Sequence, residues 1–328
     1  MARKIFRPEV FQGHMKHKKY FEGWYFKHDT PASPADDPDL PKEVFAVIPG
    51  VSLVNRQDRH AFIQVIESSH ATHYLTYDIE EFKAGKRSFS IQIGDNYFSR
   101  KGITLNIDRK EVKLAGTISY EGVTPFPVTL ASPGIMGWYG YVPFMECFHG
   151  VVSMNHILNG SMVMDGRTID FTGGKGYIEK DWGTSFPRDY IWIQCNDFAN
   201  ERVSFMLSIA TIPWMGKEFV GFLGFLYTGE QLYRFATYNR STIQELAVSD
   251  NAISTRISNS RYDLWVTVQG RDSGSLAAPR SGTMDRYIKE SVMSRVRITL
   301  KDKLGKLLFD GTGDPAGFEI SGDIEKLF

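Results

Sequence analysis

Short runs in which apolar and polar residues alternate fill most of the chain, and turn-forming residues separate them. Residues 203–210 and 262–268 show the alternation that half-buried strands require, because successive strand side chains point to opposite faces of a sheet. Residues 162–171 form two such runs around Asp165-Gly166. This pair predicts a tight hairpin, since both central residues of a type I′ turn need a positive φ.

Turns of this kind recur from residue 43 to residue 310, with few convincing helices between them. The best helix candidate, residues 241–246, is short and ambiguous. Repeated strands and tight turns are typical of antiparallel sheets closed into barrels or sandwiches. We therefore expect an all-β protein with few helices.

The order of the segments indicates an internal duplication. A chain of 328 residues is too long for one ordinary core. An aromatic run at 22–27 precedes a polar insertion at 31–41 and several strands, and a second run at 179–182 precedes an insertion through 187 and further strands. We expect two barrel-like or sandwich-like halves packed together, an N-terminal domain at 1–172 and a C-terminal domain at 173–328.

Composition limits which partners the chain can bind and indicates its cellular compartment. The 38 Lys and Arg residues balance 38 Asp and Glu residues, which removes the positive field that sequence-independent nucleic-acid binding needs. The chain has neither an apolar run long enough to cross a bilayer nor the apolar segment of a secretory signal. Cys147 and Cys195 lack CxxC spacing and fit a reducing environment. We expect a cytoplasmic protein that does not bind nucleic acid.

The basic run at 16–19 permits two interpretations. It could make weak, salt-sensitive peripheral contact with the anionic lipids of a membrane, or it could be a solvated N-terminal arm. The sequence leaves the oligomeric state open.

Two aromatic segments carry the most unusual chemistry. Residues 20–28 and residues 176–183 each place an acidic residue within three positions of a tryptophan in a strand-like run, where acids are normally scarce. A carboxyl group among aromatic rings is either a hydrogen-bonded structural group in the core or a group that takes part in catalysis. The aromatic, Gly- and Pro-rich connector at 133–150 lacks a clear period, and we expect it to line a pocket or to cap a barrel mouth.

Six segments together resemble the tocopherol cyclase family, in the same order along nearly the whole chain: residues 21–27, 137–139, 145–153, 176–187, 192–196 and 317–322. The resemblance implies a pair of lipocalin-like β-barrels, related to carotenoid hydratases and to certain fungal cyclases. It also implies that plant members carry a plastid-targeting extension, which we do not find in this sequence.

The resemblance implies a redox-neutral ring closure, the activity of an intramolecular lyase or isomerase. Such a cyclase protonates an alkene of a prenyl chain, and the quinol hydroxyl adds to the resulting cation. This chemistry needs no cofactor and no metal, and the chain contains no GxGxxG after a strand, no GxxxxGK[ST] and no HExxH. A hydrophobic small molecule is the expected partner.

Acidic residues near aromatic rings are the candidates for catalysis, because alkene protonation demands a carboxylic acid kept protonated in a dry cavity. Glu179 and Asp181, two apart in an extended segment, point to one side and are the first choice, with a structural pair at a turn as the alternative. Glu22 is the second candidate, or else a salt-bridge partner between the barrels. Glu146 and His149 are candidate bases, although His149 could also be a satisfied buried histidine.

Aromatic and amide side chains are the candidates for substrate binding. Gln194 and Asn196 could bind a ring hydroxyl or could satisfy a strand edge. Aromatic rings stabilise a nearby cation by about 2 kcal/mol when the cation is desolvated, although aromatic residues in β-proteins often form plain core. The expected pocket walls are Trp24, Tyr25, Trp138, Tyr139, Trp182 and Trp192.

Two functions from different classes are therefore open. One is a cofactor-independent cyclase, or a related hydratase or isomerase, that acts on a prenylated quinol or a similar isoprenoid. The other is a lipocalin-like carrier that binds a hydrophobic ligand without converting it. A barrel interior suits both, and fold alone does not choose between them. Buried acidic side chains distinguish the cyclase from the carrier, since a carrier for a neutral lipid does not need them.

Overall fold

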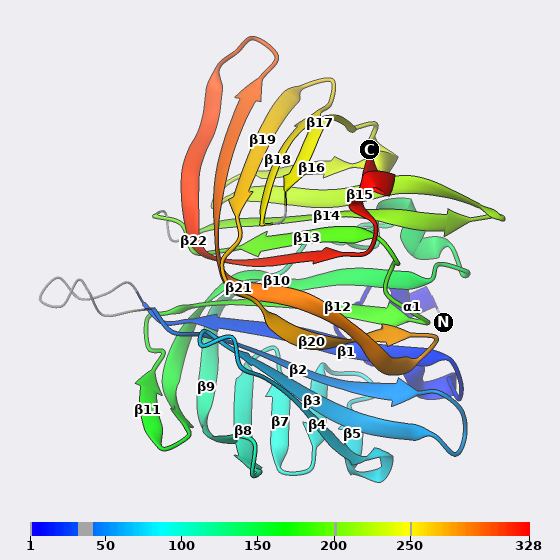
Figure 1. Ribbon diagram of the computed structural model, residues 1–328, viewed down its shortest axis with the longest axis vertical. Helices are drawn as coiled ribbons and strands as arrows, with labels where there is room; N and C mark the ends of the chain where they lie inside the picture. The colour runs from blue at the N-terminus through cyan, green and yellow to red at the C-terminus, as the bar shows by residue number, and fades with distance from the viewer. Residues whose placement is uncertain (1, 32–41, 200–201, 250) are drawn as a thin grey trace, which may run out of the picture. The chain divides into compact units, whose positions relative to one another are not determined.

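The structure is a computed structural model that describes residues 2–31, 42–199, 202–249 and 251–328 (Figure 1). Residues 32–41 of the expected polar insertion lie outside the described residues. Within the described ranges the chain consists largely of antiparallel strands in two large sheets, which confirms the all-β prediction. None of the helices in these ranges is both long enough and apolar enough to cross a membrane.

The contacts divide the chain into two compact units. The first comprises Met1–Phe186 together with Leu276–Tyr287, and the second comprises Pro187–Ser275 together with Ile288–Phe328. The boundary expected at residues 172 and 173 comes before strand β12 (Lys175–Gly183), whose pairing with two strands of the first sheet keeps it in the first unit.

The sheet of the first unit has 12 strands within the described residues. Their order is β4-β3-β2-β1-β12-β10-β9-β8-β7-β6-β5, with β11 paired to β10. The elements that precede β12 are α1 (Ala2–Ile5), η1 (Gly13–Met15), β1 (Tyr20–Asp29), β2 (Val44–Leu53), β3 (Arg59–Glu67), β4 (Thr72–Asp78), η2 (Ile79–Glu81), β5 (Phe82–Ala84), β6 (Ser90–Ile93), β7 (Asn96–Ser99), β8 (Gly102–Asp108), β9 (Lys113–Thr124), η3 (Gly137–Tyr141), β10 (Cys147–Met164) and β11 (Arg167–Asp170).

The second sheet has 10 strands among the described residues. Their order is β16-β15-β14-β13-β22-β21-β19-β18-β17, with β20 paired to β21. The elements are β13 (Tyr190–Cys195), β14 (Val203–Trp214), β15 (Lys217–Thr228), β16 (Leu232–Ala236), η4 (Thr237–Asn239), β17 (Thr242–Ser249), β18 (Ala252–Ser258), β19 (Tyr262–Gln269), β20 (Gly274–Arg280), β21 (Thr283–Asp302), β22 (Leu307–Ser321) and η5 (Ile324–Leu327).

Strand patterns in the sequence explain the local structure well. Asp165 and Gly166 both have positive φ, and they join β10 to β11 as the predicted hairpin turn. The helix candidate at 241–246 is wrong, because these residues lead into and form strand β17. Every second or third residue of that strand is half-buried, which is the pattern of a strand with one face toward a core.

Each unit has its own apolar core. In the first unit, Leu75 on β4 and Ile91 on β6 join the same buried cluster as Phe26 on β1. The sheet is therefore curled so that strands from its two ends share one interior, nearly as in a barrel. The second unit has a separate cluster that includes Ile193 on β13 and Val266 on β19.

Residues 276–287, the arm, extend from the part of the chain that forms the second sheet but belong to the first unit. The side-chain amide of Gln64 on β3 donates to the Ala277 carbonyl and accepts from the Ala277 N–H, each at 3.0 Å. The Ser52 hydroxyl on β2 donates to the Gly282 carbonyl at 2.7 Å. The first unit is therefore completed by a segment that follows it far along the chain.

Candidate functional site

Three adjacent strands, β1, β12 and β10, position the candidate acids (Figure 1). Glu179 on β12 lies opposite Tyr25 on β1 and Val151 on β10, and Asp181 lies opposite His149 on β10. Residues directly opposite in antiparallel strands project from the same face of the sheet. The register therefore gathers the predicted residues Tyr25, His149, Glu179 and Asp181 on one face.

His149 lies between the two carboxylates. Its Nδ1 is 2.8 Å from Oδ1 of Asp181, a hydrogen bond, and its Nε2 is 3.3 Å from Oε2 of Glu179. The second contact is close enough to be an ion pair, but its angles do not fit a hydrogen bond. The Glu179 side chain is 4% exposed, that of His149 13% and that of Asp181 21%. Water therefore reaches the cluster from the Asp181 side.

The pKa shifts follow from this geometry. Burial raises the pKa of Glu179, and the charge of His149 partly offsets that shift. Burial also disfavours the charged form of His149, but the charges of Asp181 and Glu179 outweigh it and raise the pKa of His149 well above its usual range. The cluster thus combines a charged imidazole with a buried carboxyl that holds its proton more tightly than an exposed one.

Three neighbours that were not among the predicted site residues complete the site. The Tyr177 hydroxyl donates to Oε2 of Glu179 at 2.7 Å, and the Met136 sulfur accepts the backbone N–H of His149 at 3.2 Å. The Cys147 thiol lies 3.8 Å from Oδ1 of Asp181. Tyr177 could have been found from the strand period, since it stands two residues before Glu179 and shares its face.

His149, Glu179 and Asp181 offer one ligand atom each, all within 4.8 Å of one another, so they are also candidate metal ligands. A metal ion needs one ring nitrogen and the carboxylate oxygens to converge on a single point. Here the imidazole ring stands between the carboxylates and turns a different nitrogen toward each. This arrangement fits a charged imidazole better than a metal ion.

Glu22 lies elsewhere and has a structural environment. Its carboxylate is fully buried, 2.5 Å from the ammonium of Lys180, and it accepts backbone N–H groups of Gln12 and Gly13. Tyr20 donates to it as well. Lys180 follows Glu179 directly on β12, so this ion pair lies on the opposite face of the sheet from Glu179.

Trp24 and Trp182 lie with that ion pair and not with the acids. The Lys180 ammonium is 4.7 Å from the Trp24 ring centroid and 4.6 Å from that of Trp182. Trp182 also stacks on Phe148, with centroids 5.5 Å apart. Both tryptophans therefore pack around a buried cation in the core of the first unit.

The connector residues have mixed positions. Trp138 and Tyr139 stack on each other in η3, with centroids 4.1 Å apart, and Trp138 is 46% exposed. Glu146 is half-buried, and its backbone carbonyl accepts the N–H of Thr184 at 2.8 Å. Glu146 directly precedes β10, two residues before Phe148 and three before His149.

The remaining predicted residues belong to the second unit. Trp192, Gln194 and Asn196 are buried on or just after β13, and the Gln194 amide donates to the Asn196 side chain at 3.1 Å. Their roles in binding a ring hydroxyl remain predictions.

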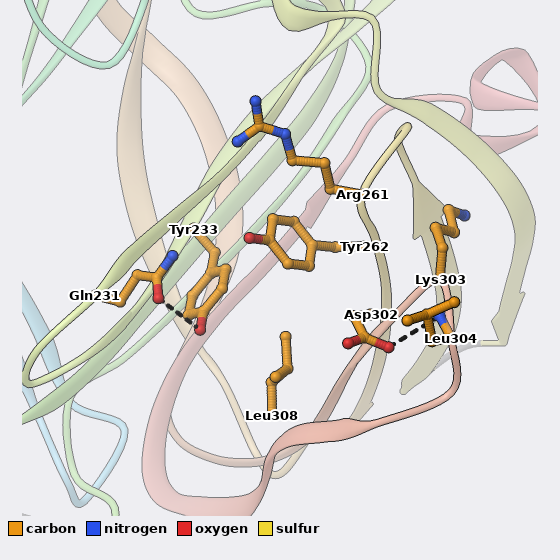
Figure 2. A pocket seen from close by; sticks show the side chains of 8 residues that line it. All are labelled: Gln231, Tyr233, Arg261, Tyr262, Asp302, Lys303, Leu304 and Leu308. Atoms are coloured by element: carbon orange, nitrogen blue, oxygen red, sulfur yellow. Dashed lines mark hydrogen bonds between the residues drawn. The ribbon is translucent and has the colours of Figure 1, made fainter.

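The second unit also contains a hollow of about 390 Å³, which none of the predicted residues lines. Figure 2 shows the rings of Tyr233 and Tyr262 beside it, with centroids 5.1 Å apart and ring planes at 89°. The other lining residues are Gln231, Arg261, Asp302, Lys303, Leu304 and Leu308. Its mixture of rings, cations and an acid differs from the buried carboxyl and imidazole of the cluster in the first unit.

Comparison with known proteins identifies the family. Residues 106–322, more than half of the chain, match the family model described as tocopherol cyclase-like. The chain belongs to this family. The matched segment includes His149, Tyr177, Glu179 and Asp181, and so the whole acid cluster.

Two curated relatives of the chain are plant proteins. The chain is 24% identical over 209 residues to a protein of Oryza sativa subsp. japonica named probable tocopherol cyclase, chloroplastic. The aligned segment covers 60% of this chain and 44% of the relative. The chain is 24% identical over 202 residues to the tocopherol cyclase, chloroplastic, of Zea mays, covering 57% and 41%. The chain thus spans less than half the length of these relatives.

Solved structures share the fold at low identity. CghA, crystallised with Sch210972, has a TM-score of 0.57 at 8% identity, over 93% of this chain and 89% of CghA. A candidate AttH protein from Nitrosomonas europaea has a TM-score of 0.54 at 13% identity, over 92% of both chains. These likenesses describe the fold and carry no further statement about chemistry.

Proposed function

We propose that the chain catalyses a cofactor-independent, redox-neutral ring closure of a prenylated quinol or a similar isoprenoid, with Glu179 as the proton donor. The observation that carries the proposal is the buried Glu179 carboxyl beside the His149–Asp181 pair, inside the segment that matches the family. A buried carboxyl with a raised pKa keeps its proton at a pH at which an exposed carboxyl has lost it. Such a group can protonate an alkene in a dry site.

The proposed step conserves atoms and electrons. Glu179 gives its proton to one carbon of the prenyl double bond, which leaves a tertiary cation at the other carbon and a carboxylate at Glu179. The quinol oxygen adds a lone pair to the cation and forms the C–O bond that closes the ring. Its proton then returns to the Glu179 carboxylate. No electron leaves or enters, so the scheme includes no cofactor.

Each neighbour has a role in this scheme. His149 is held charged by Asp181 and stabilises the Glu179 carboxylate while that group lacks its proton. His149 thus acts as a fixed charge instead of the base expected from the sequence. Tyr177 donates to the same carboxylate oxygen and orients it. Tyr25 projects from the face of Glu179 and offers a ring to the cation.

Support for a cyclase comes from the family and from the names of the plant relatives. A carrier for a neutral lipid would gain nothing from a buried carboxyl and a charged imidazole, because burying them costs stability. We therefore favour catalysis over simple binding.

The test uses the purified chain with a panel of prenylquinols and chromatography of products that have the mass of the substrate. Glu179→Gln removes the proton and keeps the shape, so we expect kcat to fall by about a hundredfold or more. Asp181→Asn should cause a smaller loss, because it weakens the charge on His149 without removing the donor.

Glu67→Gln is the matched control. Glu67 is a half-buried carboxyl whose pKa burial raises, 3.6 Å from His73, in the same unit but outside the cluster. It should retain activity. Unchanged turnover in Glu179→Gln, or an equal loss in Glu67→Gln, would contradict the assignment of Glu179.

A further inference from the structure

The connector between β9 and β10 exposes an unusual number of large apolar side chains. Their exposed fractions are 82% for Leu130, 61% for Phe144, 46% for Trp138, 46% for Tyr141 and 38% for Val128. Single exposed apolar residues are common, but several on one short segment mark a surface that binds something. We call these five residues the apolar patch.

Local geometry holds members of the apolar patch together. Trp138 and Tyr141 are three residues apart in the 3-10 helix η3, where three residues make one turn, so they share a face. The Tyr141 hydroxyl donates to the Leu130 carbonyl. The Phe6 ring contacts the Tyr141 ring with centroids 6.4 Å apart, which brings the N-terminal segment beside the patch.

That N-terminal segment carries positive charge. Arg7 donates to the backbone carbonyl of Arg87 at 2.6 Å, and Glu9 lies 3.1 Å from Arg7 and 3.5 Å from Arg100. Burial lowers the pKa of His14, and the nearby charges of Lys4 and Lys86 lower it further. Arg7 and Arg100 therefore lie beside the Glu9 carboxylate, and Lys4 and Lys86 lie close enough to His14 to affect its pKa. We call Lys4, Arg7, Lys86, Arg87 and Arg100 the basic patch.

The connector also reaches the candidate site. Met136 is 8% exposed, and its sulfur contacts the backbone N–H of His149. Two residues later in the same segment, Trp138 is half exposed. One short stretch of chain therefore leads from the surface to the acid cluster.

We propose that the apolar patch and the basic patch together bind the surface of an anionic lipid bilayer. Tryptophan and tyrosine favour the headgroup level of a membrane, and leucine and phenylalanine favour the acyl boundary below it. Lysine and arginine beside them are attracted to anionic headgroups. The contact differs from the weak one expected at residues 16–19, since here apolar anchors accompany the charge. Its biological purpose rests on the proposed function: a prenyl chain dissolved in a bilayer would enter along the connector.

The experiment measures co-sedimentation of the full chain with vesicles of phosphatidylcholine alone and of equal parts phosphatidylcholine and phosphatidylglycerol. We expect binding to the anionic vesicles that weakens as salt is raised. The double variant Leu130→Ser with Phe144→Ser should lower the partition constant by about tenfold, because apolar burial sets the binding strength. Lys86→Glu with Arg87→Glu should remove the preference for anionic vesicles.

The matched control is Leu304→Ser with Leu307→Ser, which removes two exposed leucines from the second unit. It should bind like the unaltered chain. Absence of vesicle binding, or equal binding by the patch variants and the unaltered chain, would overturn the proposal. Self-association that the patch variants abolish, without vesicle binding, would also overturn it and would assign the patch to a second copy of the chain. The Leu130→Ser, Phe144→Ser variant is also assayed with a short-chain, water-dispersed prenylquinol. Turnover of this substrate shows that the proposed reaction is intact, so that a loss of membrane binding is not mistaken for a failure of the reaction.

Discussion

At the scale of single residues, successive positions of β12 have different chemical environments. Glu179 and Asp181 face the imidazole of His149, whereas Lys180 between them faces Glu22 in the core. The alternation of strand side chains permits this, because neighbouring residues project from opposite faces. One short segment thus supplies the proposed proton donor on one face and a structural ion pair on the other.

The charge on His149 makes a specific prediction about pH. Its pKa is raised in the folded chain above the value near 6.5 of the unfolded chain. The stabilisation is therefore complete below pH 6.5 and is lost as pH rises through the folded value. We expect His149→Gln to lower the free energy of unfolding by about 3 kcal/mol at pH 6, and by less at high pH. Denaturant unfolding of both chains at several pH values measures this, and a constant difference would contradict a charged His149.

The sequence could predict part of this site, and strand geometry explains which part. The period of two was enough to place Glu179 and Asp181 on one face. The same period places Trp182 on the other face, where it packs against Lys180. The approach of His149 depends on the register between β10 and β12, which shifts at irregularities after Val151. Such shifts have no signal in a single sequence.

At the scale of elements, the N-terminal segment is fastened to β1 and β12 by the Glu22–Lys180 pair. Lys180 donates to the carbonyls of Pro8 and Val10 at 2.8 and 2.7 Å, and Glu22 accepts N–H groups of Gln12 and Gly13. Burial lowers the pKa of Lys180, and the charge of Glu22 opposes that shift. The pair satisfies backbone groups of a segment that has little regular structure of its own.

Removing one partner of this pair should destabilise the fold without changing the chemistry. Lys180→Met leaves the Glu22 carboxylate buried without its cation, and we expect a loss of about 3–5 kcal/mol in the free energy of unfolding. Arg297→Met is the control, because the exposed Arg297–Asp310 pair at 2.9 Å should contribute less than about 1 kcal/mol. Denaturant unfolding gives both values. Turnover below the transition should persist in Lys180→Met, and its disappearance would place Lys180 in the reaction.

At the scale of the whole molecule, sequence order and spatial order differ. Strand β12 pairs with β1, and the arm at 276–287 returns to bind β2 and β3. The all-β class followed from local periodicity, which short segments encode. The division of the chain into two units did not follow from local periodicity. Long-range strand pairing and the return of the arm depend on contacts between residues distant in sequence.

The arm predicts a long-range contribution to stability. Gln64→Leu removes both hydrogen bonds to Ala277 and leaves its buried N–H and C=O without these partners, so we expect a loss of about 3 kcal/mol. Gln92→Leu is the control, since the Gln92 side chain is exposed and donates to the nearby Gly94 carbonyl. Thermal unfolding of the two variants would contradict this account if their midpoints matched.

The central claim, a proton delivered from Glu179 to an alkene, is tested most directly by running the reaction in deuterium oxide. The account predicts a ring-closed product that carries one non-exchangeable deuterium. The label lies on the former alkene carbon that is adjacent to the carbon bearing the new C–O bond. The account also predicts that Glu179→Gln forms this product at least about a hundredfold more slowly while Glu67→Gln does not. A product without that deuterium, an oxidised product, or full labelling at an undiminished rate in Glu179→Gln would contradict the account.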